Sequence, residues 1–370
     1  MYETHHKLRF LTVHVINPQA NPEKALHTAE ELESLIETLG GEVVDRVIQK
    51  RENPDLATFI GKGKVQEVVE ILKETKVDVV VLNSMAKPRQ VHALKQFFIK
   101  ENPEIDVWDR VDLILHIFEK HATTTEAKLQ IELARMRYMG PRIYGMGYVL
   151  SRQGGGIGTS GVGETNTELM KRHWRSEMKK ITDQLDKVSD NREEQLKRRQ
   201  KAGLKTVSIV GYTNAGKSSL FNLLTGKDML VEDALFATLD STVGRMYLEQ
   251  IHTEVLITDT IGFIRNLPPR LITAFKSTLM ESIHADVLLH VIDVSDPEIH
   301  GKIQVVQEIL QRLGRDKDEV LYVFNKIDAM DDVPKKELLE RYAVNTPLFI
   351  SVKTQTGIQE LQDAIAKRLK

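Results

Sequence analysis

The first third of the chain alternates short apolar runs with segments in which apolar residues recur every three or four positions. Apolar runs are typical of buried strands, and the second pattern is typical of helices that place one face on a core. The alternation predicts strands at 8–15, 42–48, 77–82 and 105–108. It predicts helices at 22–39, 64–74 and 87–99, and the segment 111–118 leads into a further helix. Alternating strands and helices favour a parallel sheet covered by helices. We therefore expect an N-terminal α/β domain over residues 1–120.

The pattern changes in kind after residue 120. Residues 121–139 carry apolar side chains at helical spacing, and the pattern is interrupted by Gly140 and Pro141. A glycine-rich stretch follows at 154–163, and residues 164–201 then contain no glycine or proline. Apolar residues recur every three to five positions in this last segment, which predicts one long helix with an apolar seam formed by Leu169, Trp174, Met178, Ile181, Leu185 and Val188. We expect the two helices to form an antiparallel hairpin in a domain over residues 121–203.

The polar face of the predicted long helix is rich in lysine and arginine. Such a face is usually a solvated surface, but beside a glycine-rich loop it also suits contact with the phosphate backbone of RNA. Both interpretations stay open at this stage. The aromatic content of 6% makes phosphate contact better supported than stacking on bases.

The last part of the chain, residues 204–370, opens with an apolar strand pattern, the string GYTNAGKS from 211 to 218, and a helical pattern. This order is the context of a phosphate-binding loop. Its two glycines let several backbone N–H groups point at an anion, next to the positive end of the helix. Lys217 would reach the outer phosphates, and Ser218 would hold Mg2+ through its hydroxyl. The loop residues expected to contact a nucleotide are Gly211, Tyr212, Thr213, Asn214, Ala215, Gly216, Lys217, Ser218 and Ser219.

A second phosphate-end motif follows about 40 residues later. An apolar strand ends in Asp259, Thr260, Ile261 and Gly262. The Asp259 carboxylate would hold Mg2+, mostly through water, and the Gly262 N–H would meet the third phosphate. That contact would couple the following segment to the nucleotide state. We expect all four residues to lie in the site.

The string NKID, which follows an apolar strand at 320–324, predicts which base the bound nucleotide carries. The Asp328 carboxylate can accept hydrogen bonds from both N1–H and the 2-amino group of guanine, whereas adenine would leave it unpaired. Lys326 would lie along the base plane, and Asn325 would brace the loop. Ser351, Val352 and Lys353 follow a further strand and are expected to form the last loop at the base edge. The ligand is therefore expected to be GTP or GDP.

The candidate first switch lies between these motifs, in the string FATLDST from 236 to 242. Phe236, Ala237 and Thr238 are expected to contact the nucleotide. Thr238 would bind Mg2+ only when the third phosphate is present, and Thr242 is the alternative. The expected reaction is hydrolysis of GTP to GDP and phosphate, with Lys217, Thr238 and Gly262 as the catalytic residues.

Two residues suggest how that hydrolysis is controlled. GTPases of the Ras type place a glutamine after the Asp-x-x-Gly motif to orient water, and here this position is Phe263. Intrinsic hydrolysis should therefore be slow and should depend on a partner or an ion. Asn214 resembles the loop asparagine of GTPases that bind K+ beside the phosphates, so we hypothesise stimulation by K+. Equal turnover in Na+ and K+ would count against that hypothesis.

Composition narrows the remaining possibilities. The 370 residues suggest two or three domains, and the net charge of −2 gives no global attraction to nucleic acid. No cysteine is present, which excludes disulfides and thiolate metal sites. The histidines show no spacing typical of metal ligands, so no transition metal is expected. No apolar run approaches a membrane span, and the N-terminus has no signal-peptide core, so a cytoplasmic protein is expected. We also expect a monomer, without DNA as a partner.

A short basic motif lies inside the N-terminal domain. Two glycines and two lysines, from Gly61 to Lys64, precede a predicted helix. They could hold a phosphate of a nucleotide or of RNA at the helix N-terminus, or they could form a strand-to-helix turn with solvated lysines. The two interpretations are equally well supported by so short a signal.

Together, these residues resemble the HflX family of translational GTPases, in the Obg/HflX superfamily, over nearly the whole chain. The most specific strings are IGKGK at 60–64, HATTTEAKLQIELARMRY at 121–138 and GGGIGTSGVGETNTE at 154–168. The strings GYTNAGKS, FATLD, DTIGFI and NKID also look like this family's. Ser160, Val162 and Ser241 depart from the pattern, and Ser160, where arginine is expected, weakens any phosphate contact by the glycine-rich loop.

The resemblance implies a GTPase that binds the large ribosomal subunit and its RNA and acts in splitting or rescue of stalled or idle ribosomes. It also implies an N-terminal domain that contacts ribosomal RNA and for which ATP is a candidate ligand. A ribosome-assembly GTPase and a regulatory GTP-dependent binding module with incidental hydrolysis remain alternatives.

Overall fold

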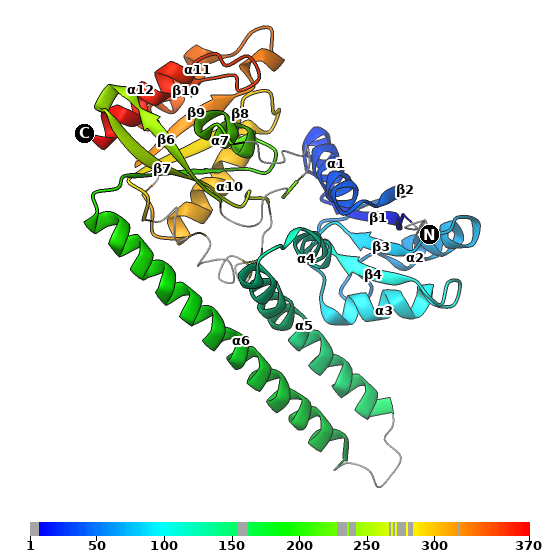
Figure 1. The fold of residues 1–370 in the computed structure, drawn as a ribbon. Coiled ribbons are helices and arrows are strands. Elements are labelled where there is room, and N and C mark those ends of the chain that lie inside the picture. The colour runs from blue at the N-terminus through cyan, green and yellow to red at the C-terminus, as the bar shows by residue number, and fades with distance from the viewer. Residues whose placement is uncertain are drawn as a thin grey trace, which may run out of the picture. The chain divides into compact units, whose positions relative to one another are not determined.

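The computed structural model describes residues 7–153, 162–227, 235–236, 242–265, 268, 271, 279, 284–316 and 319–370, of which 141–153, 162–167, 196 and 200 are described by their backbone alone. The chain divides into two compact units, residues 1–120 with 129–184 and residues 121–128 with 185–370. Each unit contains one largely parallel sheet (Figure 1), so the predicted α/β class is confirmed. The domain boundaries at 120 and 203 stay predictions.

Four parallel strands form the sheet of the first unit, in the order β2-β1-β3-β4. The strands are β1 Arg9–Ile16, β2 Glu42–Lys50, β3 Val79–Leu82 and β4 Asp106–Asp109. The helices are α1 Pro22–Leu39, α2 Lys62–Glu74, α3 Pro88–Phe98 and α4 Arg110–His121. The pattern of apolar positions located these elements well, although β2 (EVVDRVIQK) and β4 (DVWD) also contain several charged residues.

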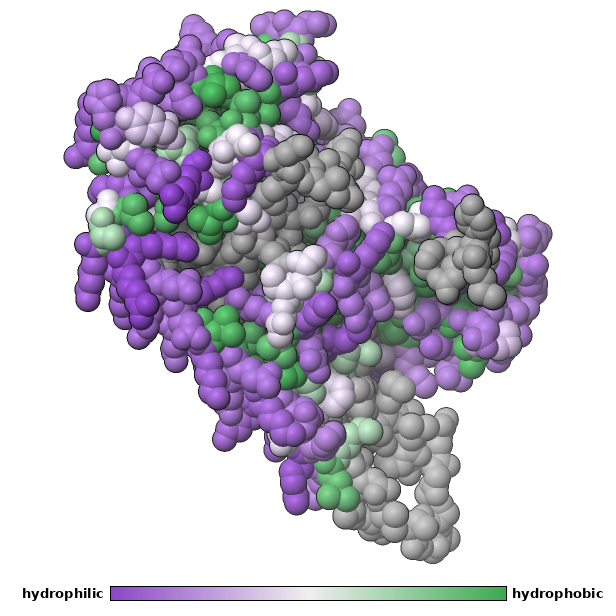
Figure 2. All heavy atoms as spheres, viewed as in Figure 1, coloured by the Kyte–Doolittle hydropathy of each residue, from purple (hydrophilic) through white to green (hydrophobic). Residues whose placement is uncertain are grey.

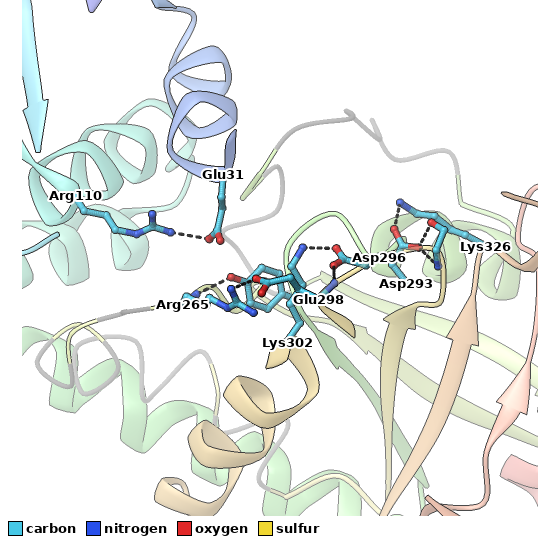
Figure 3. A network of polar contacts seen from close by, with 10 residues as sticks. Glu31, Arg110, Arg265, Asp293, Asp296, Glu298, Lys302 and Lys326 are labelled. Atoms are coloured by element: carbon cyan, nitrogen blue, oxygen red, sulfur yellow. Dashed lines mark hydrogen bonds and ion pairs between the residues drawn. The ribbon is translucent and has the colours of Figure 1, made fainter. Parts of the chain in front are cut away.

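Helices cover both faces of this sheet. Leu11 and Val13 of β1 pack into one core with the apolar faces of α2 and α3. Because side chains alternate along a strand, their neighbours point to the other face, where α1 and α4 lie. An ion pair of 2.6 Å joins Arg110 of α4 to Glu31 of α1 (Figure 3), and the Arg110 side chain is only 2% exposed. Such a buried pair is costly to break by removing one partner, so it fixes α4 against α1.

Two long helices form the predicted hairpin, α5 Thr125–Gln153 and α6 Val162–Lys201, side by side in Figure 1. The Trp174 Nε1–H donates to the Met136 carbonyl at 3.0 Å. Two details of the prediction are wrong. His121 ends α4, and α5 starts after Thr124, whose hydroxyl accepts the Ala127 N–H at 3.1 Å as a helix cap does.

The predicted end of α5 is also wrong. α5 continues through Gly140 and Pro141, where the sequence suggested an interruption. Proline removes one backbone hydrogen bond and strains the preceding turn, but a long helix can retain its other bonds around it. The seam of α6 is also shorter than predicted, because Ile181 and Leu185 are buried whereas Leu169 is 53% exposed.

The visible face of α6 is largely hydrophilic (Figure 2). Several of its cations are paired with acids one turn away on the same helix: Lys180 with Glu177, Lys197 with Glu193 and Arg198 with Glu194. Pairs of this kind stabilise an exposed helix by only a few tenths of a kcal/mol each, about 0.2–0.5. They also offset part of the positive charge that the sequence places on this face.

Six strands form the sheet of the second unit, in the order β10-β9-β8-β5-β7-β6. β6 runs antiparallel to β7, and the other neighbours are parallel. The strands are β5 Thr206–Gly211, β6 Thr242–Leu248, β7 Thr253–Asp259, β8 Val287–Asp293, β9 Val320–Asn325 and β10 Leu348–Phe349. Among the described residues, the helices that follow α6 are α7 Lys217–Thr225, α10 Ile299–Arg312, α11 Lys335–Arg341 and α12 Ile358–Leu369, and short 3-10 turns lie at Glu249–Ile251, Ile327–Ala329 and Ala343–Asn345.

The six-stranded sheet is also covered on both faces. α7 and α12 contribute buried leucines, isoleucine and phenylalanine to one core together with alternate residues of β5, β7 and β8. α10 lies over the other face, where the Gln307 side chain donates to the Tyr322 hydroxyl at 2.7 Å. Among the described residues, no helix is both long and apolar enough to span a membrane.

A glycine in the first unit provides a test of its packing. A Cβ on Gly41 would overlap the Phe10 ring and lie 2.8 Å from Ile36 Cγ2, and both side chains are buried. We expect Gly41→Ala to lower the free energy of unfolding of this unit by about 1–3 kcal/mol, because the core must shift to accept a methyl group. Urea unfolding followed by Trp108 fluorescence, in a Trp174→Phe background, would measure the change.

Gly63 of α2 is the matched control, since nothing lies within 4 Å of a Cβ built there. Gly63→Ala should raise the free energy of unfolding by about 0.5–1 kcal/mol, as alanine does in a helix interior. Equal effects of the two substitutions would contradict the packing described around Phe10.

Candidate nucleotide-binding site

The carboxyl ends of four neighbouring strands meet at one edge of the second sheet. β5, β7, β8 and β9 end there in Gly211, Asp259, Asp293 and Asn325. Ligands of open parallel sheets bind at this kind of edge, in the crevice beyond the strand ends. The motifs that lie far apart in the sequence are therefore brought together by strand order.

The phosphate loop runs from Gly211 to the start of α7 and fits closely against its neighbours. A Cβ on Gly211 would overlap the Val291 carbonyl, and a Cβ on Gly216 would overlap the Asn325 side chain. Gly216 also has a φ of 92°, a conformation that favours glycine. Asn214 has a φ of 61° and is exposed. Glycine is thus required at 211 and 216 by close approach of the backbone.

Helix α7 begins at Lys217 with Gly216 as its N-cap, and no side chain caps it. Its first N–H groups are therefore suited to an anion. Lys217 is only 6% exposed, and its Nζ donates to the Tyr212 carbonyl at 2.8 Å. Burial lowers the pKa of Lys217 from 10.5 to about 8, against the opposing effect of the Asp259 carboxylate. An anion beside this ammonium would favour its charged form.

Ser218 and Asp259 lie in direct contact, with the Ser218 hydroxyl donating to Asp259 Oδ2 at 2.6 Å. A hydroxyl and a carboxylate are the oxygen ligands that suit Mg2+ beside phosphates. The residues present therefore fit this ion, which when bound would neutralise charge on the phosphate oxygens. The Thr260 hydroxyl donates instead to the Ile209 carbonyl, and Ile261 is buried, so only their backbone atoms face a ligand.

Gly262 lies against the phosphate loop. A Cβ at this position would be 2.7 Å from Thr213 Cγ2 and 3.0 Å from Lys217 Nζ. The absence of a side chain lets the backbone approach the lysine ammonium closely. The Phe263 side chain, which occupies the position of the Ras-type glutamine, is 1% exposed and buried in the core. A phenyl ring has no hydrogen-bonding group with which to orient water.

The base-end residues form a second group at the same edge. The Asn325 amide donates to the Ala215 carbonyl at 3.0 Å, and its oxygen accepts the Val352 N–H at 3.1 Å. This side chain therefore links the phosphate loop to the loop after β10. The Ser351 hydroxyl donates to Asp328 Oδ1 at 2.5 Å and is the main cause that holds the pKa of Asp328 below its ordinary value. Asp328 and Lys353 are exposed, as a base-reading edge requires.

Sequence reasoning missed one member of this group. Asp293, at the end of β8, forms an ion pair of 2.7 Å with Lys326 (Figure 3). Lys326 has a φ of 66°, and this pairing fixes the direction of its side chain. A signal was available in the sequence, because Asp293 is a polar residue that directly follows an apolar strand at the same sheet edge.

The remaining predicted residues are placed in part. Phe236 is buried and has a φ of 62°, whereas Ala237 and Thr238 lie outside the described residues. Thr242 starts β6 and is paired in register with Asp259 of β7. Ser219 lies in the first turn of α7. Most of the glycine-rich loop at 154–163 also lies outside the described residues.

The basic motif of the first unit is arranged around the start of α2. Gly61 is the N-cap, and its N–H donates to the Gln49 side chain at 2.9 Å. Lys64 pairs with Glu67 one turn further along. The Gly61 N–H and the Lys64 ammonium are groups that would bind a phosphate, and both are already paired with other side chains. These contacts therefore support the interpretation as a strand-to-helix turn with solvated lysines. ATP at this domain stays a prediction.

Three family models match the chain. The model described as GTP-binding GTPase N-terminal matches residues 27–119, and GTP-binding GTPase Middle Region matches residues 121–199. The model described as 50S ribosome-binding GTPase matches residues 206–326. The third match includes the phosphate loop, Asp259, Gly262 and Asn325.

Full-length relatives and solved structures agree with these matches. The chain is 42% identical over 363 residues to GTPase HflX of Caldanaerobacter subterraneus, covering 98% of this chain and 81% of that protein. It is 38% identical over 349 residues to GTPase HflX of Escherichia coli, covering 94% of this chain and 80% of that protein.

A crystal structure of the SsGBP and GDP complex matches with a TM-score of 0.55 and 25% identity, covering 97% of this chain and 98% of that one. A GTP-binding protein of Sulfolobus solfataricus in complex with GDP has the same fold, at a TM-score of 0.51 and 24% identity over 97% and 98%. By this similarity over nearly its full length, the chain belongs to the HflX family of GTPases.

Proposed function

We propose that the protein is a GTP-hydrolysing switch that binds the large ribosomal subunit and acts in splitting or rescue of stalled or idle ribosomes. GTP binds with Mg2+ at the strand ends of the second unit, where Lys217 meets the outer phosphates and Asp328 reads guanine. Thr238 and Gly262 respond to the third phosphate, and Asn214 is the candidate K+ ligand. Hydrolysis to GDP then lowers the affinity for the ribosome.

The single observation that carries the nucleotide part is the placement of four polar side chains, an ammonium, a hydroxyl and two carboxylates, at one sheet edge. Lys217, the Ser218–Asp259 pair and Asp328 come from α7, β7 and the turn after β9, and strand order brings them together. The Asn325 side chain bridges the phosphate end and the base end through two hydrogen bonds. These groups suit the two ends of one guanine nucleotide.

Support for the ribosomal part comes from other sources. The family model matched at 206–326 is described as a 50S ribosome-binding GTPase, and the relatives are members of the HflX family. α6 adds a hydrophilic surface rich in cations, although part of its charge is paired internally. The buried Phe263 supports slow intrinsic hydrolysis, because nothing at this position can orient water. The ribosome would stimulate hydrolysis by supplying a group that orients the attacking water.

Sedimentation with ribosomes tests the proposal. The protein is mixed with intact ribosomes in GTP, in GDP and in a non-hydrolysable GTP analogue, and Lys217→Ala serves as the control that lacks the phosphate contact. We expect analogue-dependent binding to the large subunit and separation of the two subunits. Enrichment on immature particles alone would favour a ribosome-assembly role. Binding that ignores the nucleotide would contradict the switch.

Asp328→Asn tests the assignment of the base. The amide offers a donor where the carboxylate offered an acceptor, so preference should move from guanine to xanthine nucleotides. We expect GTP affinity to fall by at least about a hundredfold, the scale of a polar mismatch in a built site. Equilibrium binding of labelled nucleotides measures this shift. Asp332→Asn, an exposed carboxylate a few residues away, is the matched control and should bind as the parent protein does.

The lowered pKa of Lys217 predicts uptake of protons on nucleotide binding. Without a nucleotide, this pKa lies at about 8, so a growing fraction of the ammonium is deprotonated as the pH rises through that value. Phosphates favour the charged form, so binding near pH 8 must return a proton. Calorimetry in buffers of different ionisation enthalpy should detect uptake at about pH 8 and little at about pH 7. Lys217→Arg, which stays charged, should lose the effect; identical uptake in both proteins would refute the assignment.

A further inference from the structure

The start of the phosphate loop is paired with the segment that follows Gly262. Tyr212 and Phe263 form an isolated parallel bridge outside the named strands. The Phe263 N–H donates to the Gly211 carbonyl at 3.0 Å, and the Thr213 N–H donates to the Phe263 carbonyl at 2.9 Å. These two bonds on either side of Tyr212 set the register between the loop and residue 263.

A side chain adds a third bond to this pairing. The Tyr212 hydroxyl accepts the backbone N–H of Arg265 at 2.8 Å, and Tyr212 is only 5% exposed. Lys302 of α10 lies over its ring, with Nζ 4.8 Å from the ring centroid, and pairs with Asp296. The phenol is thus directed toward residue 265 and α10, and only the backbone of Tyr212 serves the phosphate loop.

The Arg265 side chain fastens the same segment to α10. Its guanidinium pairs with Glu298, the N-cap residue of α10 (Figure 3), and the two side chains are 14% and 13% exposed. Gly301 leaves room for it, since a Cβ there would lie 2.5 Å from Arg265 Nη2. A charge-assisted pair so far removed from water is costly to break by removing one partner.

Gly262 lies between these anchors and the phosphate loop. Its place against Thr213 and Lys217 depends on where residues 263–265 are held. We propose that Tyr212 and Arg265 are positioning residues that hold the Gly262 N–H where it distinguishes GTP from GDP. Their side chains act through the segment 263–265, and the inference rests on the proposed role of Gly262 at the third phosphate.

The consequence is a difference between two affinities. GDP is held by the loop, Lys217 and the base-end residues, none of which needs Arg265. A nucleotide with a third phosphate also needs Gly262 in place. Loosening residues 263–265 should therefore weaken triphosphate binding and leave diphosphate binding nearly unchanged, whereas general damage to the fold weakens both.

The experiment measures equilibrium affinities for GDP and for a non-hydrolysable GTP analogue in full-length Tyr212→Phe and Arg265→Gln. The first removes only the hydroxyl and leaves a buried N–H without its acceptor, and the second removes the charge. We expect the ratio of analogue affinity to GDP affinity to fall about five- to tenfold in each. Tyr247→Phe and Arg245→Gln, at exposed residues of β6 in the same unit, are the matched controls and should leave the ratio unchanged.

Two further variants separate positioning from folding. Gly301→Ala should displace the guanidinium and lower the same ratio, although alanine normally stabilises a helix interior. The exchange Arg265→Glu with Glu298→Arg should restore part of the ratio that either single change removes. Parallel loss of both affinities, or an unchanged ratio, would overturn the inference. Failure of the parent protein to prefer guanine nucleotides would instead overturn the proposed function itself.

Discussion

The close approach of the phosphate loop to two neighbouring strands is the constraint on which the second unit depends. Side chains at 211 and 216 would overlap the Val291 carbonyl and the Asn325 amide. The loop can therefore follow its path only with glycine at both places, and that path directs its N–H groups and Lys217 inward. The Asn325 side chain at the end of β9 donates a hydrogen bond to this loop and accepts one from the Val352 N–H at the base end, so it holds both loops together.

Burial of charge is the cost of this arrangement. Lys217 is almost fully enclosed, and its ammonium is satisfied by the Tyr212 carbonyl while Asp259 opposes the lowering of its pKa. Ser218 binds the Asp259 carboxylate in the same way. These contacts among the protein's own groups hold the site in shape, and they involve the same atoms that phosphates and a metal ion would use. At Lys217, Ser218 and Asp259, binding would exchange one set of polar contacts for another.

The segment after Gly262 is likewise held in place by contacts with the protein's own groups. Its backbone is paired with the loop, its Arg265 N–H is bound by a tyrosine of the loop, and its guanidinium is bound by the N-cap of α10. This segment is therefore tied to α10, a helix on the outside of the sheet. In the first unit, the buried Arg110–Glu31 pair has a comparable structural role, because it fixes α4 against α1.

The class of fold and the chemical nature of the candidate site could be predicted from the order of residues along the chain. The four strands of the first sheet and the helices α1, α2 and α3 were located to within two residues, because short apolar runs and helical periodicity report which side chains are buried. The phosphate loop, Asp259, Gly262 and the residues 325–328 were identified because each motif is local and its chemistry follows from residue type and order. The pairing of Asp293 with Lys326, of Tyr212 with Arg265 and of Arg265 with Glu298 became evident from the folded chain alone. The folded chain also shows that α5 continues through Pro141 and that Leu169 is exposed. Those contacts join residues 30 to 50 or more positions apart or depend on packing between elements, and no periodicity within a single segment encodes which distant side chains meet.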